Sequence, residues 1–324
     1  MSLYAIADLH ITYKSNREAF EKLSPKPGDG LILAGDGRLT RPRTTDKFDP
    51  DQITVGEHIE HLHEVFSIAT KRFSKVFWVP GNHELYSSFH SQEQEMHLKG
   101  ESKYMACVVA AKQYGVITPE DEFVTWEYTS ITGQPEKALV CPIFCLYDYS
   151  FRPAHVTREK AIDWALEEGI NATDEHLLHP DPYSSRDEWC ARLVQQAENK
   201  LTAAQKTGLP LVIVNHWPLR EDTVFIPRVP RFSLWCGTKK TEDWHTRFNA
   251  KVVVTGHLHV RRTDWIDSVR FEEVSLGYPK QWQEARDAGN DINSMLREIL
   301  PGPLTPEPGT EPKTNWRRLG WGWD

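Results

Sequence analysis

The sequence predicts an α/β protein built in layers, with β-sheets covered by helices. Short apolar segments rich in Val, Ile, Leu and Phe alternate along the chain with segments whose apolar residues recur at helical spacing. The chain has 324 residues, enough to bury a large core, and 39% hydrophobic with 26% charged residues is an ordinary globular composition. Alternating strand and helix patterns of this kind are typical of α/β folds.

The predicted strands are short runs of aliphatic and β-branched residues that stop at Gly, Pro or a polar residue. They are residues 3–7, 30–35, 75–79, 138–146, 209–214 and 251–256, and a last segment begins at Val269. Pro142 lies inside the fourth run. It indicates an edge strand or a bulge, because proline has no amide hydrogen to donate to a neighbouring strand.

The predicted helices show apolar residues three or four positions apart. They are residues 16–23, 52–73 and 105–116, followed by a polar helical region at about 152–207. This order indicates a single domain over residues 1–300, in which 152–207 is an insertion that could form a cap. Residues 301–324 form a tail rich in Pro, Gly and Trp, which we expect to be irregular but packed against the domain.

Composition and charge narrow the function classes. A formal net charge of −8 disfavours nucleic acid as a partner, since phosphate backbones bind basic surfaces. The five cysteines include no CxxC pair, which argues against a disulfide framework and a thiolate zinc site and favours free thiols in the cytoplasm. The N-terminus reads as a strand rather than a signal peptide, and no apolar run reaches membrane-spanning length, so we expect no membrane partner.

Polar side chains follow five predicted strands at the point where each strand ends. In chain order they are Asp8 and His10, then Asp36, then Asn82, His83 and Glu84, then His216, then His257 and His259. Taken singly, each is more often a turn former or an ordinary surface histidine. Ligands of open α/β sheets gather outside the carboxyl ends of the strands, so five coincidences at that end indicate one common site.

The residue types at these positions predict a particular metal chemistry. Carboxylate, imidazole and amide ligands without thiolate suit Mn, Fe, Zn or Co rather than a structural zinc site. Six or seven ligands are too many for one ion that keeps an open position. Two ions that share one bridging carboxylate would use them all, and paired ions about 3.5–4 Å apart are the arrangement that promotes phosphoryl displacement.

Five motifs occur in the order expected of one enzyme family. They are D-x-H (Asp8, His10), G-D (Gly35, Asp36), G-N-H-E (Gly81 to Glu84), a single His (His216) and G-H-x-H (Gly256 to His259). The series resembles the calcineurin-like metallophosphoesterase superfamily and spans most of the chain. The resemblance implies a four-layer sandwich in which two mixed β-sheets are flanked by helices, and an enzyme that hydrolyses phosphoesters.

The resemblance also implies ligands for two divalent ions, with Mn or Fe favoured over Zn or Co. One ion would be held by Asp8, His10, Asp36 and His259, and the other by Asp36, Asn82, His216 and His257. Asp36 would bridge the ions, and a hydroxide between them would attack phosphorus. Asn82 would help to neutralise the phosphoryl oxygens, and His83 would act as general acid or stabilise the transition state. Glu84 would orient His83 from outside the metal shell.

Residues that choose the substrate are expected in the loops around this centre. The candidates are Arg38, Tyr147, Asp148, Arg228 and Arg231. Arginines can hold a phosphate or carboxylate, and aromatic rings beside them can stack on a base or sugar. Each candidate has an ordinary alternative, because aromatics also pack an insertion against a core and arginines also pair with surface acids.

The sequence therefore predicts a metal-dependent phosphohydrolase that acts on a small phosphorylated molecule, with monoester or diester left open. A nucleotide or cyclic-nucleotide phosphodiesterase is the alternative. A phosphoprotein phosphatase is less favoured, because a long insertion suggests a covered site rather than an open groove. A non-catalytic scaffold is disfavoured as well, since every ligand motif and His83 are intact.

Overall fold

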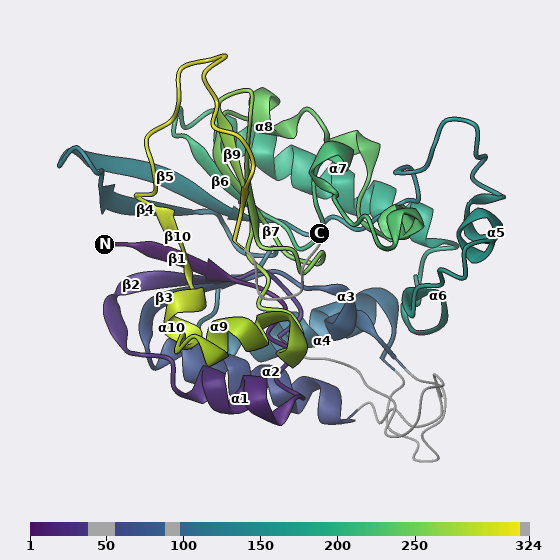
Figure 1. Ribbon diagram of the computed structural model, residues 1–324, viewed down its shortest axis with the longest axis horizontal. Coiled ribbons are helices and arrows are strands. Elements are labelled where there is room, and N and C mark those ends of the chain that lie inside the picture. The colour runs from purple at the N-terminus through teal and green to yellow at the C-terminus, as the bar shows by residue number, and fades with distance from the viewer. Residues whose placement is uncertain (38–55, 88–97, 318–324) are drawn as a thin grey trace.

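The computed structural model describes residues 1–37, 56–87 and 98–317, and two β-sheets form its centre (Figure 1). The four-stranded sheet has the order β10-β1-β2-β3 and comprises β1 (Leu3–Ile6), β2 (Lys26–Leu33), β3 (Phe73–Trp78) and β10 (Arg297–Leu300). The seven-stranded sheet has the order β11-β8-β9-β7-β6-β5-β4. Its strands are β4 (Val124–Thr129), β5 (Pro135–Pro142), β6 (Leu211–Val214), β7 (Ala250–Thr255), β8 (Arg262–Ile266), β9 (Val269–Glu273) and β11 (Asn315–Trp316).

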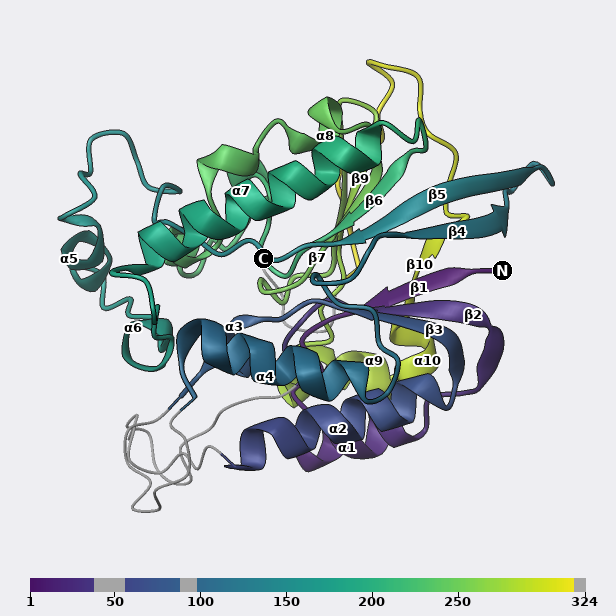
Figure 2. The same cartoon turned by 180° about the vertical axis from the view of Figure 1, so that it is seen from behind.

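Helices flank the two sheets or project from one end of the sandwich. They are α1 (Lys14–Glu21), α2 (Gly56–Thr70), α3 (Asn82–Leu85), α4 (Gly100–Lys112), α5 (Ala161–Leu166), α6 (Asp174–Leu177), α7 (Arg186–Gln205), α8 (Trp244–Arg247), α9 (Gln283–Asp287) and α10 (Ile292–Met295). Figure 2 shows α1, α2 and α4 outside the four-stranded sheet and α7 and α8 outside the seven-stranded sheet. This arrangement confirms the predicted sandwich of two mixed sheets flanked by helices.

The two sheets pack together through alternate residues of their strands. On each strand, the side chains of one face point into the space between the sheets. There they form one buried cluster, which includes Ala5, Ile32, Phe77, Val140, Val212 and Val254. The intervening residues, such as Leu31, Val76 and Ile213, pack against the helices. Because both faces are covered, the central strands need apolar residues at every position, which explains their unbroken apolar runs.

Parallel pairing aligns the strand ends that carry the motifs. β1, β2 and β3 are parallel neighbours, and so are β5, β6, β7 and β9. A parallel bridge joins the two sheets at their carboxyl ends. It pairs Ala7, which follows β1, with Ser275, which follows β9. The polar residues that follow β1, β2, β3, β6 and β7 therefore meet at one edge of the sandwich.

Four strands were missed by the apolar-run criterion, namely β4, β8, β10 and β11. They lie at or near sheet edges, where polar residues such as Glu127, Asp264 and Glu298 are tolerated.

The prediction from Pro142 needs correction, since β5 lies between β4 and β6. Pairing with β4 ends at Val140, so no strand faces the missing amide hydrogen of Pro142, and Ile143 N–H reaches Val214 O on the other side.

The region that we expected to be an insertion has two parts. α5 and α6 project at one end of the sandwich, whereas α7 lies along the seven-stranded sheet (Figure 1). α7 starts after Ser185, whose Oγ accepts the Glu188 amide hydrogen, and it buries Trp189 and Leu201. A cap is thus confined to the residues before α7, and that role stays a prediction.

Other sequence expectations concern thiols, membranes and the tail. All five cysteines are free and buried. Within the described ranges, no helix is both long and apolar enough to cross a bilayer. The tail packs on the domain as expected as far as residue 317, because β11 pairs with β8 and Trp316 contacts Phe225 with ring centroids 5.0 Å apart.

A buried carboxylate anchors this tail. Glu272 on β9 is 0% exposed, and its two oxygens bind Arg297 at 2.6 Å and Arg317 at 2.8 Å. The Thr263 hydroxyl also donates to Glu272, at 2.7 Å. One buried acid therefore joins β9, β10 and the residue that follows β11.

We predict that Glu272→Gln lowers the free energy of unfolding by about 3 kcal/mol, because it leaves the partly buried guanidinium groups of Arg297 and Arg317 without their counter-charge. Urea denaturation measures this change. Glu127→Gln is the matched control, since its partner Lys137 is 57% exposed and such pairs contribute less than about 1 kcal/mol. Equal destabilisation of the two variants would refute a special role for Glu272.

Candidate metal centre

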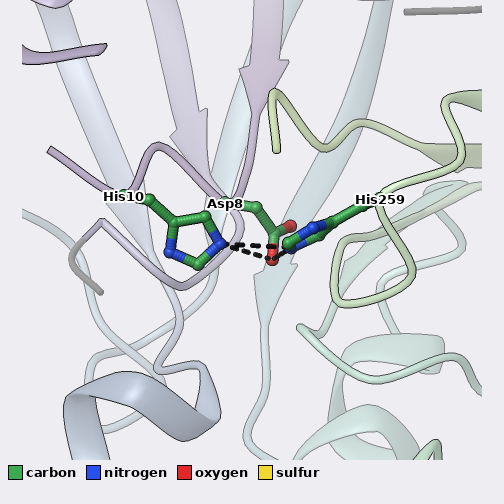
Figure 3. Close-up of side chains that lie close together, drawn as sticks. All are labelled: Asp8, His10 and His259. Atoms are coloured by element: carbon green, nitrogen blue, oxygen red, sulfur yellow. Dashed lines mark hydrogen bonds and ion pairs between the residues drawn. The ribbon is translucent and has the colours of Figure 1, made fainter. Parts of the chain in front are cut away.

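The loops after five strands bring the predicted ligands together. Asp8, His10 and His259 form one group whose ligand atoms lie within 4.8 Å of one another (Figure 3). Two overlapping groups of the same kind are His10 with Asp36 and His83, and Asp8 with Asp36 and His216. His257 adjoins this cluster, with its ring centroid 5.1 Å from that of His216. Asn82 belongs to the same turn as His83, whose amide donates to Asp36 Oδ1 at 3.0 Å.

The backbone at these positions is unusual. Among the described residues, ten that are not glycine have positive φ, and half of them are predicted ligands. Those five are Asp8, His10, Asp36, His257 and His259. Left-handed conformations are disfavoured for side chains with a Cβ, and they concentrate where function requires them. The strain therefore marks the same edge of the sheets that the sequence motifs indicated.

Glycines in three motifs leave room for the ligands. A Cβ at Gly81 would lie 2.1 Å from Asp36 Oδ1, and one at Gly35 would lie 2.4 Å from His216 Nδ1. A Cβ at Gly256 would lie 2.6 Å from Asp8 Oδ2. Glycine is required at these positions because the ligand side chains approach the backbone too closely for a Cβ. At Gly35 the φ of +92° is a second reason.

Backbone hydrogen bonds hold the strained loops against each other. The Asp8 amide donates to Gly35 O at 2.9 Å, and the His10 amide donates to Asp36 O at 3.1 Å. On the other sheet, the Gly256 amide donates to His216 O at 2.9 Å. Parallel pairing thus continues past the strands into the loops that carry the ligands.

Glu84 holds two of these loops together. Its carboxylate accepts the amide hydrogens of Asp36 at 2.9 Å, Gly37 at 2.8 Å and Gly81 at 2.7 Å. We expected Glu84 to orient His83. The contacts instead show a carboxylate that fixes the backbone around Asp36 and the turn that contains His83.

Hydrogen bonds at the rear of two imidazoles set which nitrogen faces the cluster. His216 Nδ1 lies 2.8 Å from Ala34 O, and His259 Nδ1 lies 2.9 Å from Gln281 Oε1. Both oxygens can only accept, so each Nδ1 donates its hydrogen to the protein and each Nε2 faces the cluster. Nε2 of His259 lies 2.9 Å from Asp8 Oδ1 and 3.1 Å from His10 Nε2 (Figure 3).

Three ligand atoms in the cluster have no hydrogen-bond partner among the described residues. They are Nε2 of His216, Nε2 of His257 and Oδ1 of Asn82, and all three residues are buried. Buried polar atoms are normally satisfied, because leaving one unpaired costs about 1–3 kcal/mol. A cation would bind all three atoms, so the residues present fit a metal centre.

Electrostatics favour positive charge at the same place. Burial lowers the pKa of His257 to about 3, with His216 adding to the effect, so His257 offers a neutral imidazole at neutral pH. At His216 burial acts in the same direction, but the carboxylates of Asp36 and Asp8 outweigh it and raise the pKa to about 10. Asp36 Oδ2 lies 3.5 Å from His216 Nε2, and this space attracts a cation.

The predicted substrate contacts are not gathered in the same way. Tyr147 is fully buried against Tyr149, Asp148 pairs with Lys240, and Arg231 pairs with Glu167 and Glu168. Each of the three thus has contacts within the protein, and its role in substrate binding stays a prediction. Arg228 is exposed, and its role stays a prediction. Arg38 lies outside the described residues.

Several supporting residues were missed. Asp174 and Tyr86 both bind the amide nitrogen of Asn82, at 3.0 Å and 2.8 Å. Ser275 donates to Asp8 Oδ2 at 2.6 Å, and Tyr278 stacks on His10 with centroids 4.7 Å apart. Tyr86 follows Asn82 by one helical turn, a spacing that could have found it. The others come from distant segments, and no local pattern marks them.

We predict that Gly81→Ala weakens metal binding without straining its own backbone, because Gly81 has φ −101°, which any residue adopts. The added Cβ would push Asp36 out of place. Emission spectrometry of protein loaded with Mn²⁺ should show fewer bound ions than in the wild type. Gly28→Ala is the matched control, since nothing lies within 4 Å of its Cβ. Equal Mn²⁺ contents in both variants would count against this account of Gly81.

Comparisons with known proteins agree on one family. The family model of the calcineurin-like phosphoesterases matches residues 1–261. The chain is 40% identical over 304 residues to the [Acyl-carrier-protein] phosphodiesterase PptH of Mycobacterium tuberculosis, covering 93% of this chain and 84% of that protein.

The crystal structure of Phosphopantetheinyl Hydrolase (PptH) from Mycobacterium tuberculosis superposes with a TM-score of 0.76. That pair is 39% identical and covers 94% of this chain and 98% of the other. The span matched by the family model, residues 1–261, contains all seven predicted ligands. The chain therefore belongs to the calcineurin-like phosphoesterase family and is a metal-dependent hydrolase of phosphoesters.

Proposed function

We propose that this chain is a phosphodiesterase that removes a phosphopantetheinyl group from an acyl carrier protein. The observation that carries the proposal is the likeness to PptH, which extends over 93% of the chain rather than over the motifs alone. The phosphopantetheinyl group fits the phosphorylated small molecule expected from the sequence, and in this proposal it is attached to a carrier protein. A diester linkage is also favoured over a monoester, because the relative PptH is a phosphodiesterase.

We assign the two divalent ions as the sequence predicted, with Mn or Fe as the favoured metals. Asp8, His10, Asp36 and His259 would hold one ion, and Asp36, Asn82, His216 and His257 would hold the other. The first set is supported by the convergence of its ligand atoms. The second is supported by three buried ligand atoms that lack a partner within the described ranges. Asp36 contacts residues of both sets and is the candidate bridge.

When bound, the ions would polarise the phosphoryl oxygens and activate water for attack. The side chains around them have separate tasks. Asn82 would stabilise charge on a phosphoryl oxygen. His83, whose Nε2 lies 3.8 Å from Asp36 Oδ2, would donate a proton to the leaving oxygen or stabilise the developing charge. Glu84 would keep the Asp36 loop and the His83 turn at a fixed separation.

Exposure indicates the side from which the substrate approaches. The side chains of Asp8, His10 and His216 are 0% exposed, whereas those of His83 and His259 are 12% and 11% exposed. The centre is therefore closed at the rear and reachable along the side of His83 and His259. A diester that projects from a carrier protein would enter from this side. The five free thiols agree with the predicted cytoplasmic location.

The test is to incubate the Mn²⁺-loaded enzyme with a phosphopantetheinylated carrier protein and to follow the intact mass of that protein. We expect loss of the phosphopantetheinyl mass and cleavage of bis(p-nitrophenyl) phosphate in preference to p-nitrophenyl phosphate. If the carrier protein kept its full mass while the monoester was cleaved rapidly, the assignment of the substrate would be wrong.

We predict that His83→Ala lowers kcat by about 100-fold or more, the range expected for loss of a general acid. The content of Mn²⁺ should stay at the wild-type value, since His83 is not assigned as a ligand. Turnover of bis(p-nitrophenyl) phosphate and emission spectrometry on the same sample measure the two quantities. His155→Ala, an exposed histidine of the same type, is the control and should behave as the wild type. A variant that lost one ion would make His83 a ligand instead.

A further inference from the structure

An asparagine ligand has an orientation problem that a carboxylate does not have. The oxygen and nitrogen of its amide have nearly the same shape, but only the oxygen can bind a cation. In Asn82 the nitrogen donates to Tyr86 Oη at 2.8 Å and to Asp174 Oδ1 at 3.0 Å. The oxygen points the other way and has no hydrogen-bond partner in the part of the chain that the structure describes. The amide is therefore held in the orientation that a metal ligand needs.

Tyr86 and Asp174 make the opposite orientation unfavourable. The Tyr86 hydroxyl donates to Asp174 Oδ1 at 2.5 Å, so its single hydrogen is already used. A reversed amide would place the Asn82 oxygen against two oxygens with no hydrogen left between them. Water cannot relieve this contact, because Asn82, Tyr86 and Asp174 are 5%, 1% and 2% exposed. The penalty for an unsatisfied buried acceptor thus opposes the flip.

Asp174 contacts Asn82 although it lies 92 residues later in the chain. It is the first residue of α6, and both views place α6 beside α3, which contains Asn82 (Figures 1 and 2). Arg186 fixes α6 by donating to Asp174 O at 2.7 Å and to Glu175 Oε2 at 2.9 Å. The projecting segment before α7 is thereby coupled to the metal centre through one carboxylate.

We propose that Asp174, together with Tyr86, is a positioning residue that turns the Asn82 oxygen toward the second ion. The inference rests on the proposed assignment of Asn82 as a ligand. An acid behind the amide also polarises it, which makes the oxygen a stronger ligand, and such outer partners are worth about 10- to 100-fold in metal affinity. The segment that carries α6 thus contributes to ion retention.

The test measures Mn²⁺ binding by calorimetry and emission spectrometry on protein stripped with a chelator and reloaded. We expect Asp174→Asn to bind one ion as the wild type does and the other at least about 10-fold more weakly. The new amide can offer a donor to Asn82 and so permits the flip. Excess Mn²⁺ should restore the cleavage of bis(p-nitrophenyl) phosphate, a rescue that a merely structural defect would not show.

Two reference variants separate the possible outcomes. Asp187→Asn makes the same change at another acid of the region, which pairs with Arg158 at 2.6 Å, and it should bind both ions normally. Asn82→Ala should lose the second ion outright. If Asn82→Ala lost an ion but Asp174→Asn kept both at wild-type affinity, the positioning role would be wrong. If Asn82→Ala kept both ions, the ligand assignment itself would fail.

Should Asp174→Asn fail to fold, Tyr86→Phe tests the same proposal. It removes the hydroxyl that accepts from Asn82 and leaves the carboxylate in place. We expect a smaller loss of affinity for the second ion and a melting temperature of the metal-free protein close to that of the wild type. Unchanged affinity for both ions would overturn the role of this pair.

Discussion

Left-handed backbone at the ends of the strands is the constraint on which the rest of the site depends. Asp8, Asp36 and His257 each follow a strand and turn sharply, and each turn costs on the order of 1–3 kcal/mol. Such conformations persist only where surrounding contacts determine them. Here the loops bind each other through their amides, and the Glu84 carboxylate binds three more. The geometry of the centre is thus set by backbone hydrogen bonds before any ion is considered.

The sequence revealed the centre because its chemistry is concentrated in short motifs. A strand, a small residue and a ligand lie next to one another in the chain, so the residue type and its place after a strand could be read together. The same reading predicted the sheets, since parallel strands buried on both faces need continuous apolar runs. The short edge strand β11 has no such run, and only its pairing with β8 defines it.

The supporting contacts could not be predicted for a related reason. Gln281, Ser275 and Asp174 act on ligands that are 22, 267 and 92 residues away in the chain. Their roles arise from packing between segments, which a single sequence does not display. Glu84 illustrates what a single sequence does not display. Its place beside His83 suggested a local role, whereas its carboxylate accepts backbone amide hydrogens from two different loops.

The centre also lies across the two halves of the sandwich. Asp8, His10, Asp36 and Asn82 follow strands of the four-stranded sheet, whereas His216, His257 and His259 follow strands of the seven-stranded sheet. Each proposed ion would be bound from both sheets, so it would resist any sliding of one sheet over the other. The apolar layer between the sheets and the bridge from Ala7 to Ser275 impose the same register without an ion. Packing and metal binding therefore favour one relative placement of the sheets, and each should strengthen the other.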